Sequence, residues 1–310
     1  MNALNRAGID TPELRRAYVI CRRIHARHDP ATFPSVLYLP PAKRPHLHAI
    51  YAFARRTDDI ADDHEARSRV ANFHHWAQDT KTDLRTGTST HPVRSALLHT
   101  LHTWGIHPSL VEELLDATEK DLEPTSFPTY ADLARYLYGV NSTVCLMMLP
   151  ILQPNQLDED LKSQIADLGR AIQYADNLLD LPRDIRLGRL YLPMEDLREA
   201  GLTTADLRSE QIDPTALSTL TLRSVGRIRS LFSQGHRAIT RLHPTSRPPI
   251  ACAISILEGY LSHLERHPTS LLRRRIRLPP PVFSARTAAV WYARAVSARF
   301  HGSKHTVGSW

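Results

Sequence analysis

Two pairs of aspartates, each with its members four residues apart, lie in stretches whose apolar spacing is helical. The pairs are Asp58 with Asp62 and Asp180 with Asp184. Residues i and i+4 share one face of an α-helix, so each pair directs two carboxylates toward one point. Such carboxylates repel one another unless a cation lies between them. Mg²⁺ suits this arrangement because it takes one or two carboxylates and completes its coordination with water and phosphate oxygens. Two such helices facing each other would form a magnesium-dependent diphosphate site.

The rest of the chain predicts an all-α fold. Glycine is scarce, with 12 residues in 310, and we find no alternating strands separated by tight glycine turns. Proline separates the segments of helical spacing instead. The predicted helices cover residues 42–63, 95–101, 108–120, 130–151, 161–186, 217–242 and 249–263. Pro182 should bend or locally break the helix between Asp180 and Asp184.

Composition excludes several classes of protein. Apolar residues make up 42% of the chain and charged residues 23%, which is ordinary for a soluble globular protein. No apolar run reaches the roughly 18 residues of a membrane-spanning helix, and the charged first thirty residues lack the apolar stretch of a secretory signal. Three widely separated cysteines favour neither a disulfide framework nor a thiolate zinc site. We therefore expect a cytoplasmic protein.

The net charge of +7 is concentrated near the C-terminal end, where nine Arg and Lys residues and no acidic residue follow Glu265. Such a segment can be a solvated surface, or it can bind nucleic acid, a membrane surface or a phosphate-bearing ligand. It lacks the interleaved aromatic residues of a platform for single-stranded nucleic acid. We expect no nucleic-acid partner and leave peripheral membrane contact open.

Both aspartate motifs resemble those of the squalene and phytoene synthase family, the helical trans-prenyltransferases. The second motif is the more specific, because it continues into Gly-Arg-Leu-Tyr-Leu-Pro over residues 188–193. Similar blocks lie at residues 136–144, 254–258 and 273–277, and the block at 33–40 is most similar to the bacterial hydroxysqualene synthase branch. The resemblance implies a single-domain helical bundle of the isoprenoid synthase type around a central apolar cavity. We expect this catalytic domain over residues 31–280, after a helical extension over 1–30 and before a basic tail with a short helix over 281–310.

The resemblance also implies roles for individual residues. As metal ligands and catalytic residues at the mouth of the cavity it implies Asp58, Asp62, Asp180 and Asp184. Tyr136 is implied as a further catalytic residue, although a lone tyrosine there also suits a core position with a satisfied hydroxyl. The expected substrate-binding residues are Tyr51, Arg55, Asn141, Gln173, Asp176, Arg189 and Tyr191. The implied cofactor is Mg²⁺.

The second aspartate motif departs from the family pattern at three positions. Asp176 replaces the usual asparagine, Leu179 the usual arginine, and Arg183 the usual glutamate. Asp176 can be a third metal ligand or a capped or paired polar residue. Arg183 can bind phosphate or neutralise the aspartates.

The apolar helices depart from the family pattern as well. Asn141, Ser142 and Cys145 replace small residues of the family's Val-Ala-Gly helix, and Ala253 stands where a tyrosine is common on the last core helix. Asn141 and Cys145 would narrow the space for a second prenyl chain. Leu179 and Ala253 remove groups expected near a second diphosphate. The donor half of the site is therefore intact, while the acceptor half is altered.

Two functions follow from this pattern. The first is a prenyltransferase that joins an allylic prenyl diphosphate to an aromatic small molecule in specialised metabolism. The alternative is head-to-head condensation of two prenyl diphosphates to hydroxysqualene, squalene or phytoene. A catalytically silent binding protein is a third possibility, which the four retained aspartates argue against.

Overall fold

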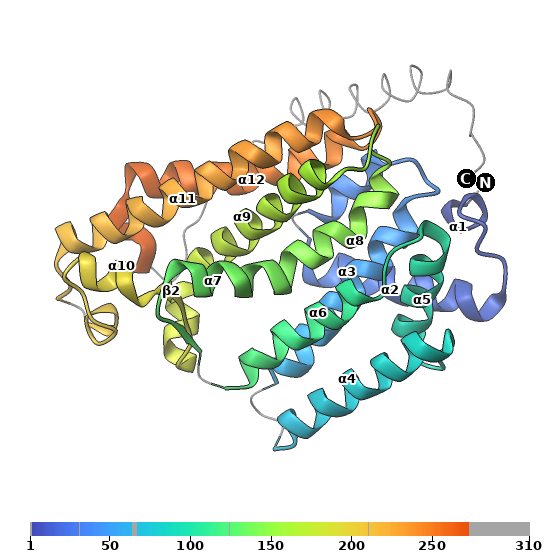
Figure 1. Ribbon diagram of the computed structural model, residues 1–310, viewed down its shortest axis with the longest axis horizontal. Helices are drawn as coiled ribbons and strands as arrows, with labels where there is room; N and C mark the ends of the chain where they lie inside the picture. Colours follow the sequence, from blue (N-terminus) through green and yellow to red (C-terminus); the bar gives the residue numbers. More distant parts are fainter. Residues whose placement is uncertain (1, 31, 64–66, 124, 210, 273–310) are drawn as a thin grey trace.

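The computed structural model describes residues 2–30, 32–63, 67–123, 125–209 and 211–272 (Figure 1). Twelve α-helices account for most of this part of the chain. They are α1 (Ala3–Arg6), α2 (Pro12–His28), α3 (Arg44–Ala61), α4 (Arg69–Thr86), α5 (Pro92–Trp104), α6 (Ser109–Thr118), α7 (Tyr130–Leu137), α8 (Thr143–Leu152), α9 (Glu159–Asp184), α10 (Met194–Glu199), α11 (Pro214–Arg241) and α12 (Arg247–Arg266). The all-α prediction is confirmed.

Short elements join these helices. The 3₁₀ turns are η1 (Phe33–Tyr38), η2 (Glu119–Leu122), η4 (Ile185–Leu187), η5 (Asp206–Arg208) and η6 (Pro268–Leu272), and η3 (Tyr138–Ser142) is a π-helical turn. Two strands that the sequence did not predict, β1 (Ser126–Phe127) and β2 (Leu190–Pro193), pair in parallel. This pair brings the segment after α9 beside the segment after η2.

The helix α9 crosses the middle of the bundle and carries buried residues along its whole length (Figure 1). It packs against α11 on one side and against α8 and η3 on the other. The helix α3 packs against α2, α5 and α8, and one continuous core of buried apolar side chains joins these elements. The two helices that carry the aspartate pairs are therefore both embedded in the core.

The predicted helix over residues 130–151 is present as α7, η3 and α8 in succession. The π-helical turn packs closely against α9 because Gly169 has no side chain. A Cβ atom built on Gly169 would lie 2.5 Å from the Cα atom of Ser142. The Ser142 hydroxyl also donates to the Ala166 carbonyl at 2.6 Å, so the two segments are fixed together.

Other local predictions met mixed outcomes. Of the two effects expected of Pro182, the break is wrong, because α9 continues through the proline to Asp184, while the bend stays a prediction. The helix α4 was missed, since Phe73, Trp76 and Thr80 are its only buried residues and its apolar pattern is weak. The expected extended link over residues 278–282 and the basic tail with its short helix lie outside the described residues.

No helix within the described ranges is long and apolar enough to cross a membrane. The cysteines Cys21, Cys145 and Cys252 are free thiols.

Candidate functional site

Both aspartate pairs lie at the C-terminal ends of their helices. Asp62 caps α3, and its backbone N–H donates to the Asp58 carbonyl at 2.8 Å. Asp180 and Asp184 occupy the last turn of α9. The carbonyl end of a helix carries a partial negative charge, which favours cations and disfavours carboxylates. Each pair therefore adds negative charge to an end that is already negative, and the two ends together favour a bound cation.

The aspartates raise one another's pKa values. Burial, Asp62 and Asp121 raise the pKa of Asp58 to about 8. Asp58 is nevertheless exposed to solvent, although protein atoms surround its carboxylate on several sides. Burial and the neighbouring Asp180 raise the pKa of Asp184 to about 7. Burial also raises the pKa of Asp180, with a smaller contribution from Asp62 across the site. The two pairs thus share one electrostatic environment.

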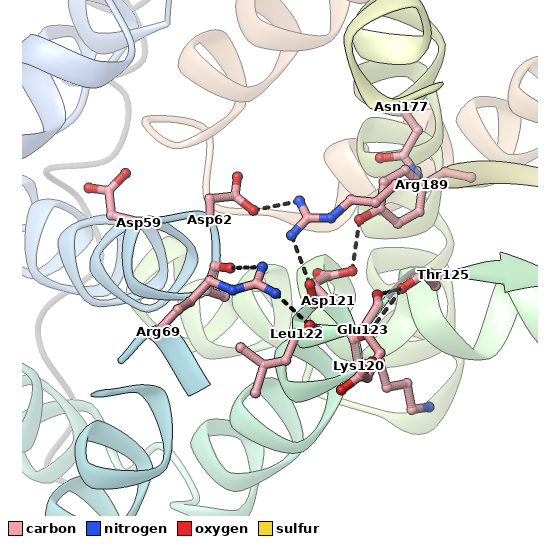
Figure 2. Close-up of polar contacts among 12 residues, drawn as sticks. Asp59, Asp62, Arg69, Lys120, Asp121, Leu122, Glu123, Thr125, Asn177 and Arg189 are labelled. Atoms are coloured by element: carbon pink, nitrogen blue, oxygen red, sulfur yellow. Dashed lines mark hydrogen bonds and ion pairs between the residues drawn. The ribbon is translucent and has the colours of Figure 1, made fainter. Parts of the chain in front are cut away.

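Arg189 links the C-terminal end of α3 to η2 (Figure 2). Its guanidinium donates to the Asp62 carboxylate at 2.6 Å and to the Asp121 backbone carbonyl at 2.8 Å. The Arg189 side chain is 6% exposed and the Asp62 side chain 30%, so this ion pair is partly buried. On the neighbouring α4, Arg69 donates to the carbonyls of Ala61 and Leu122 and holds the end of α3 against η2. The position of Asp62 is therefore fixed from two directions.

Asp121 is the centre of a polar network that the sequence analysis missed. Its carboxylate accepts hydrogen bonds from the hydroxyls of Tyr136 and Tyr191, each at 2.7 Å. The two tyrosine rings stack at a centroid distance of 5.4 Å, and Phe127 packs against both. Burial raises the pKa of Asp121, while the two hydroxyls and Arg189 lower it. A single aspartate far from its partners in sequence gives no periodic signal.

Tyr51 and Arg55 lie on α3 before the first aspartate pair. The Tyr51 ring stacks on His25 at a centroid distance of 3.9 Å, and burial raises the pKa of its hydroxyl. Arg55 forms an ion pair with Asp59 at 2.5 Å, and its Nε atom is buried without a hydrogen-bond partner. Its guanidinium thus retains a donor for a further ligand.

The remaining predicted residues lie along α9 and η3. Gln173 donates to the Asn177 side-chain oxygen at 3.1 Å, while the Asn177 amide nitrogen is buried without a partner. Burial and Asp180 raise the pKa of Asp176 to about 7. Asn141 donates to the Gly169 carbonyl at 3.3 Å, so its amide is held against α9. Asn177 was missed by the sequence analysis.

Within the described residues, no three His, Cys, Asp or Glu side chains are placed to hold one metal ion among them. Mg²⁺ bound with a diphosphate needs only one or two carboxylates from the protein, and the aspartate pairs meet that requirement. A pocket of about 220 Å³ lies beside β2, where Thr125, Gly188 and Arg208 are among its lining residues, and none of the four aspartates borders it. The central cavity implied by the resemblance stays a prediction.

A model of the squalene/phytoene synthase family matches residues 25–281 of this chain. The chain belongs to this family. The resemblance read from the aspartate motifs is thereby confirmed, and so is the prediction that the protein is a prenyltransferase enzyme.

Individual relatives agree with this assignment. A phytoene synthase of Arthrospira platensis is 28% identical over 87% of this chain and 91% of its own length. The bifunctional protein CrtB/UppS of Streptomyces coelicolor is 37% identical over 65% of this chain, and the match spans only 36% of that longer protein. The crystal structure of the squalene synthase HpnC from Alicyclobacillus acidocaldarius superposes with a TM-score of 0.76. That comparison has 26% identity and covers 85% of this chain and 98% of the other.

Proposed function

We propose that this protein condenses two prenyl diphosphates head to head in a Mg²⁺-dependent reaction. The observation that carries the proposal is the convergence of two aspartate pairs at the negative ends of α3 and α9, with buried Arg189 ion-paired to Asp62 beside them. The family match supports it, and so do relatives named phytoene synthase and squalene synthase. These relatives favour the alternative of the two functions that the sequence suggested.

Asp58, Asp62, Asp180 and Asp184 would hold Mg²⁺ together with the diphosphate. The bound metal would neutralise the charge that develops on the leaving diphosphate. The unpartnered Nε of Arg55 can donate to a phosphate oxygen, which makes Arg55 a leaving-group ligand. Arg189 is engaged with Asp62 and Asp121, so we assign it first to positioning Asp62.

The allylic C–O bond then breaks and leaves a delocalised carbocation in the apolar interior. Water has to be kept from this first cation, because it would capture the cation before the two chains are joined. The double bond of the second prenyl chain, held close to the cation, supplies the electron pair for the new C–C bond, and a proton leaves. Aromatic faces such as that of Tyr51, held by its stacking on His25, can stabilise the cation without reacting. No side-chain nucleophile is required.

Prenylation of an aromatic acceptor is the second candidate. Its specific support is Asn141, whose amide bonds to the Gly169 carbonyl and places a polar group in the helix where the family carries small residues. Polarity there suits an acceptor that carries hydroxyl groups.

Product analysis separates the two candidates. Farnesyl or geranylgeranyl diphosphate is supplied alone with Mg²⁺, and products are identified by mass spectrometry. We expect a C30 or C40 hydrocarbon, alcohol or cyclopropyl diphosphate. Release of diphosphate without any coupled product, followed by product formation when an aromatic acceptor is added, would replace the proposal with the second candidate.

A further inference from the structure

Tyr260 on α12 is a buried tyrosine with an unused hydroxyl. Its side chain is 1% exposed, and its hydroxyl has no hydrogen-bond partner among the described residues. Leaving a buried hydroxyl unpaired costs about 1–3 kcal/mol. A phenylalanine would fill the same space without that cost, so the hydroxyl needs an explanation.

Tyr260 lies near two carboxylates of α9, those of Asp180 and Asp176. The helix α12 packs against α9, and the carboxylates of Asp180 and Asp176 add to the effect of burial in raising the pKa of Tyr260. Neither carboxylate lies within hydrogen-bond distance. Tyr260 therefore lies near the Asp180 carboxylate, but its hydroxyl donates a hydrogen bond to neither aspartate.

Two other buried donors, on α3 and α9, are also unpartnered. One is Nε of Arg55 on α3, whose charge lowers the pKa of Asp180 from across the site. The other is the amide nitrogen of Asn177, which lies between Asp176 and Asp180 on α9. Arg55 on α3 and Tyr260 on α12 thus each leave a donor unused near Asp180, and a ligand rich in acceptor oxygens would satisfy both.

Tyr260 also lies seven residues beyond Ala253, the position at which the sequence lacks an expected tyrosine. Seven residues are nearly two helical turns, so positions 253 and 260 share a face of α12. We propose that the Tyr260 hydroxyl donates a hydrogen bond to a phosphate oxygen of a prenyl diphosphate bound at Asp176 and Asp180. This inference rests on the proposed function and adds to it a ligand-binding residue on α12.

The test compares Tyr260→Phe with wild type in calorimetric titrations of inorganic diphosphate at saturating Mg²⁺. A hydrogen bond to a charged group contributes about 1.5–3 kcal/mol, so the dissociation constant should rise at least about tenfold. The melting temperature should stay the same or rise, because the variant removes an unpaired buried hydroxyl. Tyr174→Phe is the matched control, since Tyr174 is fully buried on α9 and its hydroxyl donates to Ser224 at 3.1 Å. That control should lose stability and bind diphosphate like wild type.

A dissociation constant for Tyr260→Phe within twofold of wild type would overturn the inference and leave the proposed function intact, provided that Asp180→Asn weakens binding. Failure of wild type itself to bind diphosphate would overturn both. A lower melting temperature with unchanged diphosphate affinity would show that the hydroxyl is only structural. If Tyr260→Phe does not fold, 3-fluorotyrosine at position 260 gives a second test. Its ¹⁹F resonance should shift when diphosphate is added, and an unchanged resonance would refute the inference.

Discussion

Gly169→Ala tests the close contact between α9 and the π-helical turn. The added Cβ would lie 2.5 Å from the Ser142 Cα and 2.8 Å from the Ser142 backbone nitrogen. Carbon atoms in contact are normally about 3.5–4.0 Å apart, so one segment has to move by about 1 Å. Both short contacts are with backbone atoms, so no side-chain rotation relieves them. Overpacking of this kind typically costs about 1–3 kcal/mol.

The expected net loss of unfolding free energy in Gly169→Ala is smaller than the cost of the clash alone. Replacing glycine by alanine inside a helix gains about 0.5–1 kcal/mol, because the unfolded chain loses less freedom on folding. Gly226→Ala supplies this gain alone, since Gly226 lies within α11 and a Cβ there meets nothing within 4 Å. The stability difference between the two alanine variants therefore isolates the clash, and we expect about 1–3 kcal/mol in favour of Gly226→Ala.

Equilibrium urea unfolding of wild type and both variants measures this difference. We expect Gly226→Ala to raise the midpoint and Gly169→Ala to lower it, with similar slopes for all three proteins. The Asn141 bond to the Gly169 carbonyl, at 3.3 Å, should also break when the segments separate. Equal stability of the two variants would refute the close contact and the reasoning built on it.

Two further predictions concern the Asp121 network and a buried histidine. Tyr136→Phe and Tyr191→Phe should each cost about 1.5–3 kcal/mol of unfolding free energy, and a double-mutant cycle should show coupling above about 0.5 kcal/mol because both hydroxyls donate to Asp121. Strict additivity would contradict a shared acceptor. Burial lowers the pKa of His46 to about 4, compared with about 6.5 for an unfolded histidine. Between about pH 6.5 and pH 4 the unfolded state therefore binds a proton that the folded state does not, and the free energy of unfolding decreases as the pH is lowered. The stability difference between wild type and His46→Gln should therefore narrow by about 2 kcal/mol from pH 7 to pH 5, and a constant difference in urea unfolding would refute it.

The helices that the sequence predicted correctly are those whose apolar residues recur at regular helical spacing. The helices α3 and α9 bury a broad apolar face, and spacing alone places each aspartate pair on one side. The same spacing does not mark where a helix ends. Asp62 fits the helical pattern of α3, but in the structure it is the C-cap residue. The sequence therefore could not show that both aspartate pairs lie at the C-terminal ends of their helices.

The features that the sequence missed depend on contacts between distant segments. Strand β1 has two residues, too few to show alternation. Asp121 acquires its role only because β1 and β2 pair in parallel and bring Tyr191 beside Tyr136. The unpartnered hydroxyl of Tyr260 depends on the packing of α12 against α9. No local pattern carries that information.

The most direct test of the account is the rate of diphosphate release from farnesyl or geranylgeranyl diphosphate with and without Mg²⁺. We expect wild type to release diphosphate only with Mg²⁺, and Asp58→Asn and Asp180→Asn each to lose at least about 100-fold in rate, in line with losses seen when transition-state charge stabilisation is removed. Asp160→Asn is the matched control, because Asp160 lies at the opposite end of α9 and pairs with Arg241. It should release diphosphate like wild type. Full activity without divalent metal, or in either site variant, would contradict the central claim that the two aspartate pairs form one metal-diphosphate site.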